Sequence, residues 1–149
     1  MPFSFAHSRN DEPVIAVPAI GLEVRVRLSS KSTGEGLAIM ETTNAPGFGP
    51  PLHTHPETEV FHVLAGRYLY EVDGRRFYAE SGDVITVPGG MAHAFVNVTD
   101  APARQFILIM PGLFKDLRDL TKDGKIDVAA LNVYGEKWGS RFLGPPLMP

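Results

Sequence analysis

The feature that most constrains the fold is a succession of short segments in which apolar and polar residues alternate. Residues 22–28 read Leu-Glu-Val-Arg-Val-Arg-Leu, a period of two that is typical of a strand with one buried face. Similar patterns predict strands at residues 36–43, 59–64, 67–72, 75–79, 83–87, 93–98 and 104–110. Asp73 and Gly74 supply the positive-φ residues of a two-residue hairpin turn. Many short antiparallel strands indicate a sandwich or a barrel, the jelly roll among them.

The apolar spacing changes after Pro111. Leu113, Phe114, Leu117 and Leu120 recur at helical spacing, and the same pattern continues from Ile126 until Gly135 offers a helix stop. We therefore predict two short helices within residues 112–138, packed outside the barrel as part of a C-terminal helical segment 112–149. With 149 residues the chain has the size of one domain. We expect a single domain over 1–149, with a barrel core at 36–110 and N-terminal strands within 14–28.

Composition argues against several classes of partner. The chain has 14 Lys plus Arg against 17 Asp plus Glu, a balance that creates no field to attract nucleic acid or anionic lipid. It has no run of about 20 apolar residues, as a membrane span requires, and no basic, apolar leader. We expect a cytoplasmic protein without nucleic-acid or membrane partners. Because cysteine is absent, any metal must be bound by imidazole and carboxylate groups.

Two histidines and a glutamate form the first candidate metal site. His53 and His55 are two residues apart, so on a strand both side chains point to the same face. Glu59 has the same parity, but four residues of extended chain span about 13 Å, whereas ligands of one metal lie within roughly 4 Å of each other. The chain must therefore bend, and Pro56 ends the strand at the required place. We predict that the three side chains converge.

His93 is the candidate fourth ligand. It follows a turn at Pro88, Gly89 and Gly90 and begins a strand, so it can approach the same metal from a neighbouring strand. Mixed nitrogen and oxygen donors suit Fe, Mn, Co, Ni, Cu or Zn better than Mg or Ca. The alternative is a buried polar cluster without metal, in which several imidazole and carboxylate groups would be hard to satisfy.

These residues stand at the spacing of two known motifs. The first, G-x5-H-x-H-x3-E-x6-G, is matched by Gly47, His53, His55, Glu59 and Gly66. The second, G-x5-P-x-G-x2-H-x3-N, is matched by Gly82, Pro88, Gly90, His93 and Asn97. Over residues 36–110 the chain resembles bacterial single-domain cupins. The resemblance implies a cupin jelly-roll β-barrel, the double-stranded β-helix, and a four-ligand centre for one divalent transition metal at His53, His55, Glu59 and His93.

Three further segments, 50–55, 59–66 and 142–147, resemble cupins described as similar to quercetin 2,3-dioxygenase. This resemblance implies a metal-dependent dioxygenase acting on a small enolic or aromatic substrate. It also implies a catalytic role for Glu59, which would accept the substrate's hydroxyl proton as a general base. Two alternatives stay open at this point. The first is a metal-dependent isomerase or lyase, and the second is a cupin that binds a small molecule without transforming it.

Other residues receive weaker assignments. The candidate pocket-lining residues are Met40, Phe48, Phe61, Phe95, Phe106 and Leu108, although a barrel core needs such residues in any case. His62 has the parity opposite to Glu59, so we expect it on the outer face of its sheet. We also expect a homodimer, because sheet edges need covering, and residues 14–28, which begin with Val14–Val17, are the candidate edge or exchanged strand.

Overall fold

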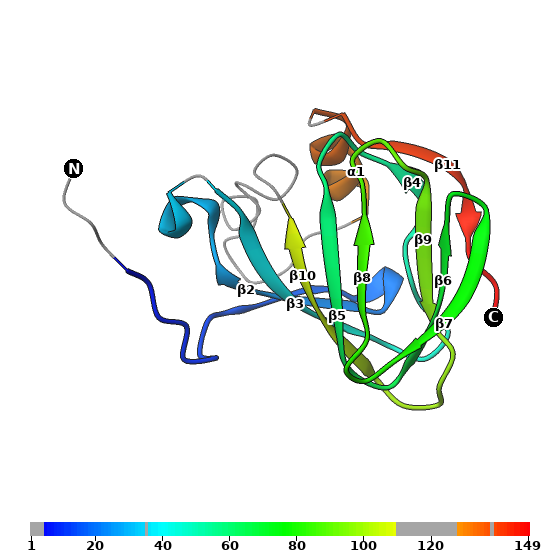
Figure 1. The fold of residues 1–149 in the computed structure, drawn as a ribbon, viewed down its shortest axis with the longest axis horizontal. Coiled ribbons are helices and arrows are strands. Elements are labelled where there is room, and N and C mark those ends of the chain that lie inside the picture. The colour runs from blue at the N-terminus through cyan, green and yellow to red at the C-terminus, as the bar shows by residue number, and fades with distance from the viewer. Residues whose placement is uncertain (1–4, 35, 110–127, 138) are drawn as a thin grey trace.

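Two antiparallel sheets make up most of the structure, a computed structural model that describes residues 5–34, 36–109, 128–137 and 139–149 (Figure 1). The six-stranded sheet has the order β1 (Val14–Val17), β2 (Leu22–Leu28), β3 (Ala38–Asn44), β10 (Ala103–Ile109), β5 (Glu59–Ala65) and β8 (Val84–Val87). The five-stranded sheet has the order β11 (Arg141–Pro146), β4 (Pro51–Thr54), β9 (His93–Asn97), β6 (Arg67–Val72) and β7 (Arg75–Glu80). Two 3-10 turns, at Pro18–Ile20 and Ser30–Thr33, and the helix α1 (Val128–Lys137) accompany them.

The main core lies between the inner faces of the two sheets. In β3 every second residue is buried, and in β5 Glu59, Phe61 and Val63 are, as the alternating sequence predicts. Phe61 from one sheet contacts Tyr70 and Phe95 from the other, with ring centroids 5.5 Å apart in both pairs. Met40 is buried in the same cluster. The two sheets therefore enclose a filled apolar interior.

A second, smaller cluster covers the outer face of the five-stranded sheet. It contains Leu69 of β6 and Ala94 and Val96 of β9, together with Leu147, which follows β11. Since His93 and Phe95 alternate with Ala94 and Val96, all five residues of β9 are buried. The strand that carries His93 is thus held by apolar contacts on both of its faces.

The predicted strands are present, with ends shifted by at most two residues. The predicted hairpin between β6 and β7 is also present, with Asp73 at φ 50° and Gly74 at φ 76°. The strand β1 pairs with β2 of the same chain and forms one edge of the six-stranded sheet.

The C-terminal segment differs from the prediction. The helix α1 lies in the segment predicted to be helical, and the first predicted helix falls outside the described residues. Residues 141–146, however, form strand β11 and not a helical continuation, and β11 pairs with β4. Pro145 and Pro146 argue against a central strand, but β11 is an edge strand, where proline is tolerated. Within the described ranges, no helix has both the length and the apolar character needed to span a membrane.

Candidate metal centre

Three histidines from the five-stranded sheet and its connections meet at one end of the barrel. His53 of β4 lies directly opposite His93 of β9, and their ring centroids are 4.3 Å apart. His55 follows β4, and its ring centroid lies 4.9 Å from that of His93. Each of the three offers one ring nitrogen, and these nitrogens lie within 4.8 Å of one another. The structure therefore brings the three predicted histidines together.

The two connections that carry these histidines pack directly against each other. The Gly90 N–H donates to the carbonyl oxygen of His55 at 2.8 Å, and the Gly89 N–H donates to the Thr58 hydroxyl at 3.2 Å. A Cβ on Gly89 would collide with the carbonyl oxygen of Pro56. The bend predicted at Pro56 is thus locked against the turn before His93 by a backbone approach that only glycine permits.

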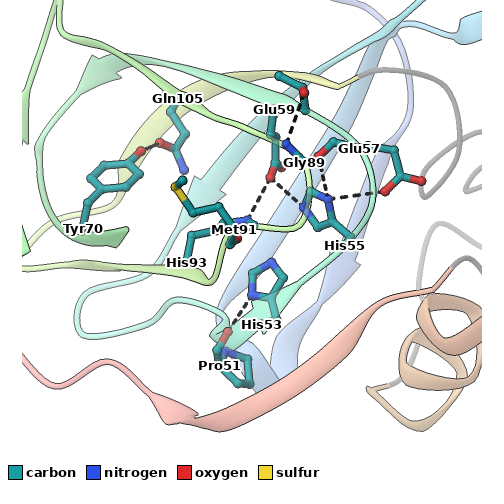
Figure 2. Close-up of polar contacts among 11 residues, drawn as sticks. Pro51, His53, His55, Glu57, Glu59, Tyr70, Gly89, Met91, His93 and Gln105 are labelled. Carbon is teal, nitrogen blue, oxygen red and sulfur yellow. Dashed lines mark hydrogen bonds and ion pairs between the residues drawn. The ribbon is translucent and has the colours of Figure 1, made fainter. Parts of the chain in front are cut away.

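Glu59, the first residue of β5, reaches the same point from the other sheet. Its Oε2 lies 2.9 Å from Nε2 of His55 and 3.0 Å from Nε2 of His93 (Figure 2). His55, Glu59 and His93 are all buried. One carboxylate oxygen therefore faces two imidazole nitrogens in a site that excludes most water.

The second nitrogen of each ring meets a backbone carbonyl oxygen. Nδ1 of His53 lies 2.7 Å from the oxygen of Pro51, and Nδ1 of His93 lies 2.9 Å from that of Met91. Nδ1 of His55 lies 3.0 Å from the oxygen of Glu57. A carbonyl only accepts, so it fixes a proton on Nδ1 and leaves the lone pair of the neutral ring on Nε2. The sequence does not reveal these partners, because they depend on local backbone geometry.

This arrangement calls for a cation between the rings and Glu59. His55 and His93 each face an acceptor at both nitrogens, but a neutral imidazole carries a single N–H. A second proton or a metal ion at Nε2 would therefore be needed to satisfy the acceptor at that nitrogen. Two ligands bound at about 2.1 Å and at right angles on one metal are about 3.0 Å apart, close to the two observed separations. The donor set therefore fits a divalent transition metal.

The pKa shifts in the site favour the protonation states of Glu59 and His53 that can bind a metal. Burial acts to raise the pKa of Glu59, but hydrogen bonds from His55 and His93 outweigh it and lower the pKa to about 2. Burial and the neighbouring His93 lower the pKa of His53 to about 4. For His55, burial acts to lower the pKa, but the hydrogen bond and charge of Glu59 outweigh it and raise the value. At neutral pH Glu59 is thus ionised and His53 is neutral.

The barrel interior beside the histidines is mainly apolar and aromatic. The ring of Phe61 lies 6.3 Å from that of His93, and Phe61 is buried in the main core cluster together with Phe95 and Met40. The Tyr70 hydroxyl donates to the side-chain carbonyl of Gln105, and both residues are buried (Figure 2). Burial raises the pKa of Tyr70 well above its usual value, so the hydroxyl keeps its proton.

Three predicted pocket residues lie elsewhere. Phe106 and Leu108 alternate with the buried Gln105 and Ile107, so they occupy the outer face of β10. Arg27 lies over the Phe106 ring at 5.5 Å from its centroid. These two assignments were wrong because β10 carries apolar residues on both faces, so the sequence pattern does not show which face is buried. His62 pairs with Phe106 and is half-buried on that outer face, as its parity predicts.

Phe48 lies at the opposite end of the barrel from His93. Its carbonyl oxygen accepts a hydrogen bond from the Asn97 N–H at 3.1 Å, at the far end of β9. A Cβ on Gly21 would lie 2.7 Å from the ring, so Phe48 contacts the turn before β2. The loop from 45 to 50 crosses the end of the barrel, and the position of Phe48 after Gly47 in the motif does not reveal that location.

Phe142 is a residue beside the site that sequence reasoning missed. The register of β11 against β4 places it opposite His53, with ring centroids 6.3 Å apart. Its side chain is 47% exposed, so it presents an aromatic surface next to the histidines. The segment 142–147 stood out in the sequence, but nothing local indicates that it pairs with β4.

Comparison with known proteins matches part of the chain to a known family. The Cupin domain family model matches residues 40–109. Germin-like protein 3-8 of Oryza sativa subsp. japonica is 38% identical over 87 residues, which cover 52% of this chain and 39% of that protein. Quercetin 2,3-dioxygenase of Bacillus subtilis (strain 168) is 34% identical over 71 residues, which cover 47% of this chain and 21% of that protein. The chain thus spans well under half the length of these curated relatives.

Solved structures show the same fold. The crystal structure of a predicted oxalate decarboxylase from Thermotoga maritima matches with a TM-score of 0.63 and 20% identity, covering 72% of this chain and 98% of that one. Residues 40–109 therefore match the Cupin domain family, and the two antiparallel sheets have the fold of the cupin jelly roll.

Proposed function

We propose that the protein is a metal-dependent cupin enzyme, a dioxygenase acting on a small enolic or aromatic substrate. His53, His55, Glu59 and His93 would hold one divalent transition metal. The observation that carries the proposal is the buried Glu59 oxygen that faces Nε2 of both His55 and His93 at 2.9 and 3.0 Å. The likeness to quercetin 2,3-dioxygenase over about half of the chain supports the choice of reaction.

Each group at the site has a distinct role in the proposed reaction. A metal bound here supplies a Lewis acid and a template for a substrate's enolate or hydroxyl oxygen. The backbone carbonyls at Nδ1 hold the imidazoles in the orientation needed for ligation. Glu59 serves as a ligand and, within hydrogen-bond reach of a substrate hydroxyl, as its base. In the absence of a metal, hydrogen bonds from His55 and His93 keep the pKa of Glu59 low, so Glu59 can accept that proton only when those hydrogen bonds are replaced.

The surroundings of the site support a planar, partly apolar substrate. Phe61 borders His93 inside the barrel, and the exposed Phe142 borders His53 at the edge. Aromatic rings favour planar partners through stacked or edge-to-face contacts. The two rings thus flank the histidines from the interior and from the strand β11.

The proposal is tested by elemental analysis of the native protein together with oxygen uptake on a panel of enolic and aromatic substrates. We expect about one equivalent of a transition metal and oxygen consumption that depends on it. Turnover under strict anaerobiosis would select an isomerase or lyase. Tight binding of a panel compound without chemical change would select a small-molecule-binding protein. Native protein without metal, and unable to bind any, would contradict the proposal altogether.

The expected cytoplasmic location stays a prediction.

A further inference from the structure

Glu57 lies next to the candidate metal centre without being one of its predicted ligands. Its carboxylate Oε2 is 3.3 Å from Nδ1 of His55, and its backbone oxygen is 3.0 Å from the same nitrogen (Figure 2). The side chains of Glu57 and His55 are 9% and 1% exposed. The backbone oxygen of Glu57 thus accepts the hydrogen bond from Nδ1, while its carboxylate lies at ion-pair distance from the same nitrogen in a largely dry environment.

The other two histidines have a different environment at Nδ1. His53 and His93 meet the backbone oxygens of Pro51 and Met91. Among the described residues, the ion pairs of the three histidines are those of His55 with Glu57 and Glu59 and that of His93 Nε2 with Glu59. A carboxylate at Nδ1 thus distinguishes His55 from its two neighbours.

We infer that Glu57 is a positioning residue that acts through His55. The backbone carbonyl of Glu57 holds the proton on Nδ1. The carboxylate beside it acts through its negative charge, which increases the electron density that Nε2 offers to a metal. Outer partners of this kind are worth roughly 10- to 100-fold in metal affinity in other proteins. The inference rests on the proposed metal site, and it makes His55 the strongest imidazole donor of that site.

The electrostatic reason lies in the local charge balance. A divalent ion bound by three neutral imidazoles and Glu59 alone would keep a net positive charge in a buried site, which is costly in a medium of low dielectric constant. The Glu57 carboxylate, one imidazole away, supplies the second negative charge. Because the imidazole transmits this charge, removing it weakens the bond from His55 more than the bonds from His53 and His93.

The test compares Glu57→Gln with the wild-type protein. Glutamine keeps the size of the side chain and the backbone carbonyl but removes the charge. We expect the Kd for Zn²⁺, measured by competition with a chelator, to rise roughly 10- to 100-fold. We also expect the electron paramagnetic resonance parameters of the Cu²⁺-loaded protein to shift. Glu80→Gln, on the exposed end of β7, is the matched control and should change neither quantity.

A double-mutant cycle shows whether the effect passes through His55. In a His53→Ala background, Glu57→Gln should still weaken Zn²⁺ binding by its full factor, whereas in a His55→Ala background it should have little further effect. An equal loss in both backgrounds would indicate a general electrostatic effect and overturn the inference. Unchanged Zn²⁺ affinity of Glu57→Gln would also overturn it while leaving the proposed function intact. If the wild-type protein bound no Zn²⁺, Cu²⁺ or other transition metal, the proposed function itself would fail.

Circular dichroism and thermal unfolding of the metal-free variants separate these effects from misfolding. If Glu57→Gln does not fold, Glu57→Asp replaces it, because aspartate keeps the charge but withdraws it by one methylene group. Glu57→Asp should then bind Zn²⁺ more weakly than the wild-type protein, and equal affinity would contradict the inference.

Discussion

At the scale of single residues, the site depends on which nitrogen of each imidazole faces inward. The motif spacing predicted His53, His55, Glu59 and His93, because ligand type and strand parity are visible in the sequence. It did not predict the carbonyl oxygens that hold the three Nδ1 atoms, nor the carboxylate of Glu57. These partners depend on how the chain turns at Pro56 and before His93. Local turn geometry of this kind is set by the packing of the two connections.

Substitution of Glu59 by Gln separates its two proposed roles. An amide keeps the size of the side chain but loses the negative charge that both imidazoles contact, so we expect metal affinity to fall. If Glu59 is also a base, the variant saturated with metal should lose kcat further, by roughly 100-fold or more. Metal content and kcat measured on the same samples distinguish the role of Glu59 as a ligand from its role as a base. A loss of activity that only follows the loss of metal would assign Glu59 as a ligand alone.

At the scale of elements, alternation predicted the strands well, whereas pairing between distant segments was not visible. The β6–β7 hairpin was predictable because Asp73 and Gly74 carry a local turn signal. The inner face of β10 was not predictable, because four consecutive residues are apolar: Phe106, Ile107, Leu108 and Ile109. The strand β11 was missed because its pairing with β4 joins segments far apart in the chain. That missed pairing is what brings Phe142 to the site.

Phe142 gives a direct test of the role of β11. We expect Phe142→Ala to raise KM for an aromatic substrate about 2- to 10-fold, which corresponds to the roughly 0.5–1.5 kcal/mol of an aromatic contact. Leu143→Ala is the matched control, because Leu143 is the next residue of the strand and is 53% exposed. Since both positions are exposed, their effect on stability should stay within about 0.5 kcal/mol. Equal KM values for wild type and Phe142→Ala would exclude the ring from substrate binding.

At the scale of the whole molecule, the buried tyrosines make the stability of the barrel sensitive to alkaline pH. Burial raises the pKa of Tyr68 and of Tyr70 above the usual value of 10. Above pH 10 the unfolded chain therefore releases these protons while the folded chain retains them. The folded state then binds more protons, and the free energy of unfolding falls as the pH rises.

Urea unfolding at pH 8 and pH 11 measures this effect. The wild-type protein should lose stability between the two values, and Tyr68→Phe should lose less, although it starts lower because the hydrogen bond to Asn44 is gone. Tyr78→Phe, at a position that is 55% exposed, should follow the wild-type protein. The same pH dependence in Tyr68→Phe and wild type would show that ionisation of Tyr68 is not linked to unfolding.

The homodimer stays a prediction, for which the β1 edge of the six-stranded sheet is the candidate interface. Among the residues that the structure describes, β1 pairs with β2 alone, and an edge of this kind can pair with another chain. Light scattering after size exclusion should give twice the chain mass of 16.2 kDa. Val14→Lys, on β1, should yield monomers, whereas Val84→Lys, an exposed valine on the opposite edge strand β8, should not. A wild-type monomer would exclude the dimer.

The position of β11 also connects the candidate metal centre to the hydrogen exchange of a strand that supplies none of its predicted ligands. The strand pairs with β4, which carries His53, and the following Leu147 covers the outer face of β9, which carries His93. Coupling between two equilibria is reciprocal, so an ion that fixes His53 and His93 must also favour the docked form of β11. The backbone amides of residues 141–144 and 147 should therefore exchange with deuterium more slowly once metal is added, although none of these residues is a predicted ligand. Unchanged exchange in this segment would show that β11 docks independently of the site.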